Sequence, residues 1–352
     1  MENIKKAERI RWIDCAKTIA IMAVLVDHTN GILYTNQDIA TASYFAVSLF
    51  VILSRMTSIS VLRAERTFSY QLRKILKMFA EYAIANGVVL IWYNKCFDLK
   101  IWISHVLNFS LQGPYYFLLF FFQLVLVAPF LNYWCKYCDN RERKWLWHIG
   151  TLVVLGYLSS VFIRYTYVLP VHGGGQFLFG GTYLLLYYIG ILFAQINLFH
   201  MGAKKRVILL VVSACTWVFW WRMMVSNKLP FDEWLSSYWG AGFNPPSVKF
   251  IVFALITLFM LYALFSLLEE YGRKIGEVIT NGLAFIGKNT LYIFMYHLVC
   301  MNIVCILFPQ IYNNIWVLRS VVFGSMLLLP VFVCWCVKKT GRIVKQYLVL
   351  DT

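Results

Sequence analysis

Stretches of about twenty mostly apolar residues recur along the chain, and they limit its fold more than any other feature. An α-helix needs a stretch of this length to cross the hydrocarbon of a bilayer. Every backbone polar group in lipid must be satisfied within the protein, which favours helices for runs of this length. The sequence therefore predicts an all-α, polytopic membrane helical bundle with about ten transmembrane helices. The expected spans are 13–33, 40–60, 76–95, 113–134, 147–168, 181–197, 205–225, 248–268, 284–308 and 315–337.

The composition supports a membrane protein built as one unit. Of the 352 residues, 61% are hydrophobic and only 14% are charged, which excludes an ordinary soluble globular domain. The first apolar run holds charged residues and lacks a small-residue cleavage site, so we expect it to remain as a helix. Because repeats and low-complexity segments are absent from the sequence, we expect residues 1–352 to form a single membrane domain.

Basic residues gather in alternate loops, which predicts the orientation of the bundle. Short loops rich in Lys and Arg stay on the cytoplasmic side. These loops hold Lys5, Lys6, Arg9, Arg11, Arg73, Lys74, Lys77, Arg141, Arg143, Lys144, Lys204, Lys205 and Arg206, among others. Both termini are therefore expected in the cytoplasm, which agrees with an even number of spans. The net charge of +16 follows from this topology and from contact with anionic lipid, so we predict no nucleic-acid partner.

The chain has nine cysteines but only one CxxC pair, Cys135 and Cys138. The pair lies in a predicted cytoplasmic loop without a second pair or a histidine at the usual ligand spacing. The pattern favours ordinary thiols over a metal site, and we predict no bound metal.

The first span contains four ionisable residues, Asp14, Lys17, Asp27 and His28. Each charge inside a bilayer costs about 2.5–3.5 kcal/mol on insertion scales, so such residues are candidates for function. Lys17 and His28 are eleven positions apart, close to three helical turns, and should share one face of the helix. Histidine exchanges protons near neutral pH and so suits general-base catalysis. Two structural alternatives remain, a local Asp14–Lys17 ion pair and a histidine hydrogen-bonded to a neighbouring helix.

A second intramembrane histidine, His297, lies near the middle of the ninth span, on the same predicted helix as Asn289 and Tyr296. Its position makes it a candidate for function, and a packing contact with another helix is the alternative. Donors for a developing oxyanion are expected by residue type among Tyr115, Tyr116, Tyr296 and Asn289.

Basic residues follow the second span and enter the third. Arg55 lies near the cytoplasmic end of one span, and Arg73, Lys74 and Lys77 begin the next. Paired cations suit a phosphorylated ligand that approaches from the cytosol. Topology alone also requires cations on this side.

Several segments together resemble the acyltransferase 3 family of integral membrane acyltransferases. The motif "IDCAKTIAIMAVLVDH" places ten residues between Lys17 and His28, as in the family's opening motif. Further matching segments, in family order, are "SLFVILSRM", "RKILKMFAEY", "GPYYFLLFFFQLVLVAPFL", "LLYYIGILFAQ" and "IGKNTLYIFMYHLV". The resemblance extends over most of the chain.

The resemblance implies transfer of an acyl group, most often acetyl, from cytosolic acyl-CoA to a hydroxyl of a cell-surface carbohydrate or its lipid-linked precursor. It implies O-acetylation of polysaccharide in a bacterial cytoplasmic membrane, without a metal. The implied catalytic residue is His28, either as a general base or as a brief carrier of the acyl group, with Lys17 supporting it or the donor. We expect donor binding by Arg55, Arg73, Lys74 and Lys77, and supporting roles for Asp14, Asp27, His297, Asn289 and Tyr296.

The chain departs from the family pattern at a few positions. Lys74 and Lys77 stand where many members have Arg-x-x-Arg, Arg55 stands where glycine is common, and Asp27 replaces a small or apolar residue. These departures leave a non-catalytic sensory relative open. The ionisable residues inside the membrane also suit a transporter or flippase for a glycolipid or acyl group. Donor binding without product would favour the sensory relative, and substrate movement without an acyl donor would favour the transporter.

Overall fold

The computed structural model describes residues 10–60, 68–164, 183–195, 201–229, 232–239, 242–309 and 316–350. Within these residues, every regular element is a helix, as the sequence predicts. In chain order they are α1 (Arg11–His28), α2 (Gln37–Ser43), α3 (Ala46–Ser60), α4 (Phe68–Asn94), α5 (Leu99–Asn108), the 3₁₀ helix η1 (Gly113–Tyr115), α6 (Tyr116–Asp139), α7 (Lys144–Arg164), α8 (Tyr183–Gln195), α9 (Ala203–Val225), α10 (Asp232–Trp239), α11 (Val248–Tyr271), α12 (Arg273–Gly287), α13 (Thr290–Leu307) and α14 (Trp316–Leu350).

Seven stretches among the described residues are long and apolar enough to cross a membrane: Gln37–Thr57, Phe68–Asn94, Gly113–Asp139, Ala203–Val225, Val248–Tyr271, Thr290–Leu307 and Trp316–Cys336. The helix α8 is apolar but shorter. The helix α1 carries Asp14, Lys17 and Asp27 and is not among the seven. These helices form the polytopic bundle that the apolar runs predict.

The structure corrects the limits of several expected spans. The first helix ends at His28, and a turn follows in which Gly31 has a positive φ of 83°. A turn at residues 44–45 divides the second span into α2 and α3. The region expected to hold the ninth span contains two helices, because α12 ends at Gly287 and α13 starts at Thr290. Parts of the expected spans 147–168 and 181–197 lie outside the described residues.

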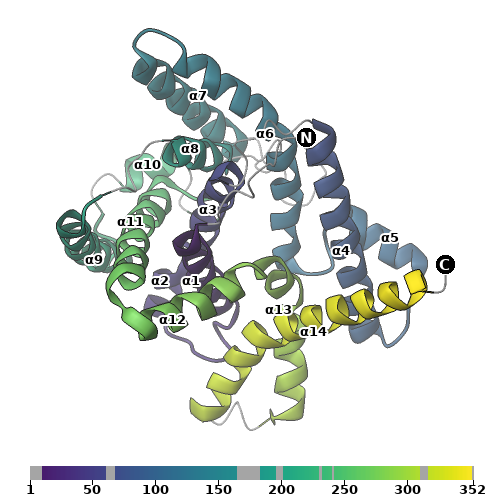
Figure 1. The fold of residues 1–352 in the computed structure, drawn as a ribbon. Coiled ribbons are helices and arrows are strands. Elements are labelled where there is room, and N and C mark those ends of the chain that lie inside the picture. The colour runs from purple at the N-terminus through teal and green to yellow at the C-terminus, as the bar shows by residue number, and fades with distance from the viewer. Residues whose placement is uncertain are drawn as a thin grey trace.

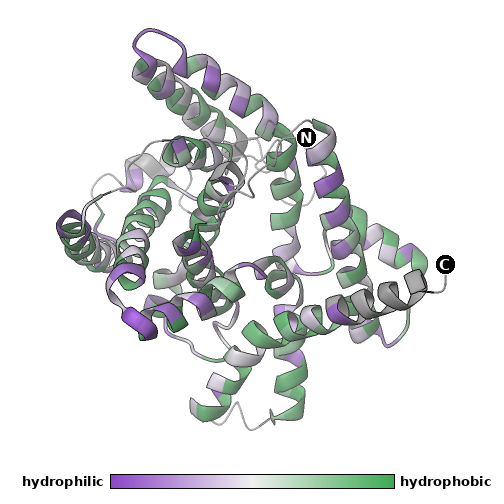
Figure 2. Ribbon diagram, in the orientation of Figure 1, coloured by the Kyte–Doolittle hydropathy of each residue, from purple (hydrophilic) through white to green (hydrophobic). Residues whose placement is uncertain are grey.

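The helix α1 lies near the middle of the bundle (Figure 1). It contacts α2, α3, α11, α12, α13 and α14, and most of its residues are buried. Large apolar side chains instead lie exposed on the outer helices, whose ribbons are largely green, the colour of hydrophobic residues, in Figure 2. Examples with at least 60% exposure are Ile84, Val153, Tyr157, Ile208 and Phe332. Exposed apolar surface of this extent fits contact with lipid tails rather than with water.

A close crossing of α1 and α12 fixes the ionisable helix in place. A Cβ atom at Gly287 would lie 1.9 Å from the Asp14 carbonyl oxygen, so only glycine fits there. The Thr18 hydroxyl donates a hydrogen bond to the Leu283 carbonyl, and the Cys15 thiol donates to the Thr280 carbonyl at 3.2 Å. Small residues permit such close helix approach in membranes. This packing holds α12, and Lys288 directly after it, against α1.

Candidate active site

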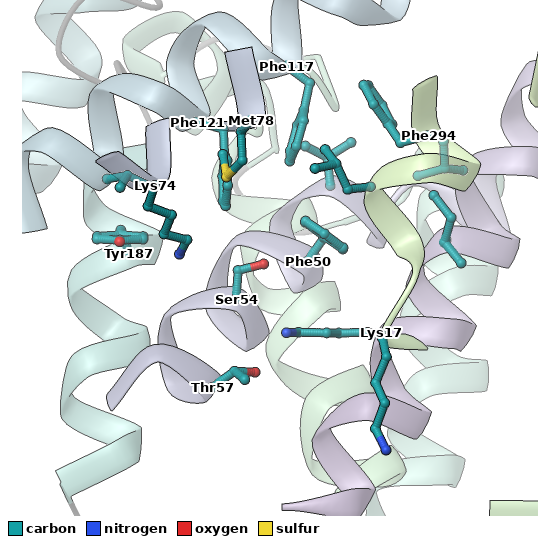
Figure 3. A pocket seen from close by; sticks show the side chains of 16 residues that line it. Lys17, Phe50, Ser54, Thr57, Lys74, Met78, Phe117, Phe121, Tyr187 and Phe294 are labelled. Carbon is teal, nitrogen blue, oxygen red and sulfur yellow. The ribbon is translucent and has the colours of Figure 1, made fainter. Parts of the chain in front are cut away.

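A cavity of about 270 Å³ lies between α1, α3, α4, α6, α8 and α13 (Figure 3). Three of its lining residues are lysines: Lys17 on α1, Lys74 on α4, and Lys288 between α12 and α13. Figure 3 shows Lys74 on the opposite side of the cavity from Lys17, with Ser54 and Thr57 between them. The rest of the lining is mainly apolar and aromatic, including Phe50, Phe117, Phe121 and Phe294. The cavity therefore offers cations and hydroxyls together with an apolar wall.

The basic residues predicted to bind the donor have different surroundings. Lys74 lines the cavity, whereas the side chains of Arg73 and Lys77 are exposed. Of these three residues, only Lys74 is among the described residues that line the cavity. The structure thus brings one of the three cations together with Lys17.

Arg55 lies next to Ser54 but is not among the described residues that line the cavity. Its side chain is 1% exposed, its guanidinium donates a hydrogen bond to the Asn132 side chain, and it lies 5.0 Å from the centre of the Tyr187 ring. Across the same interface, a Cβ at Gly190 would lie 2.8 Å from the Ile52 carbonyl. This geometry favours a role for Arg55 in joining α3, α6 and α8.

A second, smaller pocket of about 30 Å³ adjoins the cavity. Its lining includes Asp27 and His28 from the end of α1, together with Tyr44, Tyr116 and Phe243. Both hollows share four lining residues: Val24, Val47, Phe117 and Phe294. The rings of the last two lie 5.0 Å apart. Lys17 and His28 therefore mark two adjacent hollows along α1, as their shared helix face predicts.

His28 is paired with His297 from α13. The Nδ1 atom of His28 lies 2.7 Å from Nε2 of His297, and the two rings stack with a centre-to-centre distance of 4.9 Å. His297 is fully buried, and its Nδ1 lies 2.8 Å from the Phe294 carbonyl and 3.2 Å from the Ile293 carbonyl. The two histidines, 269 positions apart in sequence, form one hydrogen-bonded unit.

The hydrogen-bond partners determine which nitrogen holds a proton on each neutral ring. Carbonyl oxygens only accept, so Nδ1 of His297 must carry hydrogen and its Nε2 must accept. His28 then donates from Nδ1 to His297, which leaves the lone pair of His28 on Nε2. That Nε2 makes no hydrogen bond to a described residue. The pair thus presents His28 as a base in a fixed tautomer, beside the smaller pocket.

A family model described as an acyltransferase domain matches residues 10–338. The chain belongs to this acyltransferase family. The match spans nearly the whole sequence and both hollows of the site. No curated protein and no solved structure gives a significant match to the chain. The family and the apolar helices together describe a multi-pass membrane protein with an acyltransferase domain.

The other predicted site residues of this acyltransferase are more scattered. Asp14 is buried beside the α1–α12 crossing, and neither Asn289 nor Tyr296 is among the described residues that line the two hollows. The Asn289 side chain donates to the Phe285 carbonyl at 2.9 Å. The Tyr115 hydroxyl donates to the Met295 carbonyl at 3.0 Å. Of the four residues predicted as oxyanion donors, Tyr116 alone lines the pocket of His28.

One residue that lines the candidate site is missing from the sequence prediction. Lys288 lines the cavity with Lys17 and Lys74, but in the sequence it is one of many cations that topology explains. The useful signal was its place in "IGKNTLYIF", directly before an intramembrane helix that carries a histidine. The break between α12 and α13 places Lys288 at the cavity.

We expect replacement of His297 by phenylalanine to lower the turnover number of the acyltransferase by about tenfold to a hundredfold, with little change in the KM for the acyl donor. The variant keeps an aromatic ring but removes the acceptor that orients His28. In metal sites, loss of the group that orients a histidine typically lowers activity by this much, and we expect a similar loss here. Steady-state transfer of radiolabel from acetyl-CoA would measure both constants. An increase in KM with unchanged turnover would contradict a role in positioning His28.

Proposed function

We propose that the protein transfers an acyl group, acetyl in the simplest case, from acyl-CoA to a hydroxyl of a cell-surface carbohydrate or its lipid-linked precursor. One observation carries the proposal: a cavity with three lysines adjoins a pocket that holds a histidine base in a fixed tautomer. Ammonium groups suit the phosphates of CoA, and a histidine of this kind suits activation of a hydroxyl. Family membership supports the reaction class.

The lysine cavity is the proposed donor site, on the cytoplasmic side that the charge pattern predicts. Lys17, Lys74 and Lys288 would hold the phosphates of CoA, while its pantetheine arm lies along the apolar wall. Lys17 and His28 are eleven positions apart on α1, which corresponds to roughly 16 Å along the helix. An extended thioester arm would bring its acyl carbon past Phe117 and Phe294 to the pocket of His28.

The proposed chemistry is direct transfer with His28 as general base. Nε2 of His28 takes the proton of the acceptor hydroxyl while the hydroxyl oxygen attacks the carbonyl carbon of the thioester. The tetrahedral intermediate collapses and the C–S bond breaks. The departing CoA sulfur then receives the proton from Nε2 of His28. Tyr116, which lines the same pocket, would donate a hydrogen bond to the oxyanion. His297 would keep the imidazole in the required tautomer.

The donor site predicts different effects for two neighbouring lysines. Replacing Lys74 with alanine should raise the KM for acetyl-CoA by about tenfold or more, because a charge-assisted hydrogen bond contributes about 1.5–3 kcal/mol. Lys77→Ala is the matched control: it removes the same charge one turn away, from an exposed side chain. Kinetics with varied acetyl-CoA would measure the effect. Equal changes in both variants would show that only general surface charge matters.

Incorporation of label from radioactive acetyl-CoA into cell-envelope carbohydrate tests the function itself. Membranes that contain the protein should transfer label to carbohydrate, and membranes from the same host without it should not. Binding of acetyl-CoA with no product would favour the sensory relative. Movement of a glycolipid across liposomes without acyl donor would favour the transporter. Either result would overturn the proposed reaction.

A further inference from the structure

A second cluster of chemically reactive side chains lies away from the proposed active site, where α6 and α7 meet α8. Cys135 and Asp139 lie four residues apart on α6 and therefore on one face of that helix. The turn after α6 reverses the chain, and α7 brings His148 back to them. One ligand atom from each of the three residues lies within 4.8 Å of the other two.

The three side chains approach one another from different degrees of burial, with Cys135 buried and Asp139 exposed. Nε2 of His148 lies 3.2 Å from Oδ1 of Asp139, while its Nδ1 lies 2.8 Å from the Tyr188 hydroxyl. The Cys135 thiol is fully buried and lies 3.0 Å from Oε1 of Gln195. Metal-bound histidines usually use their second nitrogen to hydrogen-bond an outer group. Here the Tyr188 hydroxyl, on α8, lies where such an outer group would be.

We propose that Cys135, Asp139 and His148 bind one divalent transition-metal ion, and the types of these ligands favour zinc. A thiolate, a carboxylate and an imidazole nitrogen are the ligand types of zinc sites, whereas Ca²⁺ and Mg²⁺ prefer oxygen alone. Zinc bonds of about 2.0–2.3 Å place tetrahedral ligand atoms roughly 3.5 Å apart. The cluster thus needs only a small contraction. On binding, the Cys135 thiol releases its proton to solvent, and a water molecule completes the coordination.

The site reverses the expectation drawn from the CxxC pair. His148 lies ten positions beyond Cys138, at no standard ligand spacing, and only the α6–α7 hairpin brings it to Cys135. The bound ion joins α6 to α7, and its outer hydrogen bonds reach α8. Because Tyr187, next to Tyr188, lines the lysine cavity, the ion stabilises one wall of that cavity.

Cobalt and zinc binding to the purified full-length protein in detergent, with any affinity tag removed, tests the site. Co²⁺ should produce a near-ultraviolet sulfur-to-metal charge-transfer band, and elemental analysis after incubation with Zn²⁺ should give about one zinc per chain. Cys135→Ser and His148→Ala should remove the band or weaken metal affinity at least tenfold. Asp139→Asn, which keeps the shape of the side chain, should also weaken it.

Cys138→Ser is the matched control, because Cys138 is the other buried member of the pair and lies one turn further along α6. It should retain both the cobalt band and the zinc. Zinc should also raise the melting temperature of the wild type and of Cys138→Ser, but not that of Cys135→Ser. Absence of zinc from the wild type, or equal loss in both cysteine variants, would overturn the three-ligand site.

Discussion

Replacing Gly287 with alanine is expected to prevent most of the protein from accumulating in folded form. The added Cβ would lie 1.9 Å from the Asp14 carbonyl oxygen and 2.7 Å from its carbon, and both belong to the backbone of α1. No side-chain rotation relieves such a clash, so α12 must move away from α1. Overpacking of a core, with the backbone shifts that it forces, typically costs about 1–3 kcal/mol and occasionally more. Size-exclusion recovery and melting temperature in detergent would measure the loss.

Gly282→Ala provides the matched control on the same helix. A Cβ at Gly282 meets nothing within 4 Å among the described atoms, and alanine favours a helix interior over glycine by about 1 kcal/mol. This variant should be recovered as well as the wild type, with an equal or higher melting temperature. If Gly287→Ala behaved in the same way, the close crossing of α1 and α12 would be wrong.

Replacing His28 with alanine should have the largest effect on catalysis. Loss of a general base lowers turnover by about 10²–10⁴-fold. Binding of acyl-CoA should change little, because His28 lines the smaller pocket and the three lysines line the cavity. Single-turnover transfer from radioactive acetyl-CoA and equilibrium binding of the same donor would separate the two effects.

A double variant checks that His28 acts together with His297. Once His28 is alanine, the additional change His297→Phe should hardly lower the remaining activity, because His297 would act only through the His28 imidazole. Residues that work as one unit are strongly non-additive in this way. Full, additive losses would show that the two histidines act separately, despite the 2.7 Å contact between them.

The helical bundle was predictable from the sequence because runs of about twenty apolar residues in lipid have few alternatives to the α-helix. The polar face of α1 was also predictable, since Lys17 and His28 are about three full helical turns apart. The ends of individual helices depended on local turns. One turn, which contains Gly31, follows the end of α1 at His28, and another, at Lys288, separates α12 from α13. A hydropathy window of about 19 residues averages over such short turns.

Contacts between distant helices could not be predicted from one sequence. The pairing of His28 with His297 depends on how α1 and α13 are rotated and aligned across the bundle, and no local pattern records this. Arg55 illustrates the same limit, since charge alone suggested a ligand site but the side chain packs against Asn132 and Tyr187. Lys74 lines the cavity and the Lys77 side chain is exposed, although the sequence presents them as two similar lysines one turn apart.

The most direct measurement is acyl transfer across sealed, inside-out membrane vesicles, with radioactive acetyl-CoA supplied only outside them, at the former cytoplasmic face. We expect label on carbohydrate enclosed in the lumen, with a loss of at least a hundredfold in His28→Ala vesicles that contain equal amounts of protein. Label that appears equally with wild-type protein and with His28→Ala would rule out His28 as the catalytic base, and its absence from wild-type vesicles that bind the donor would rule out the transfer reaction.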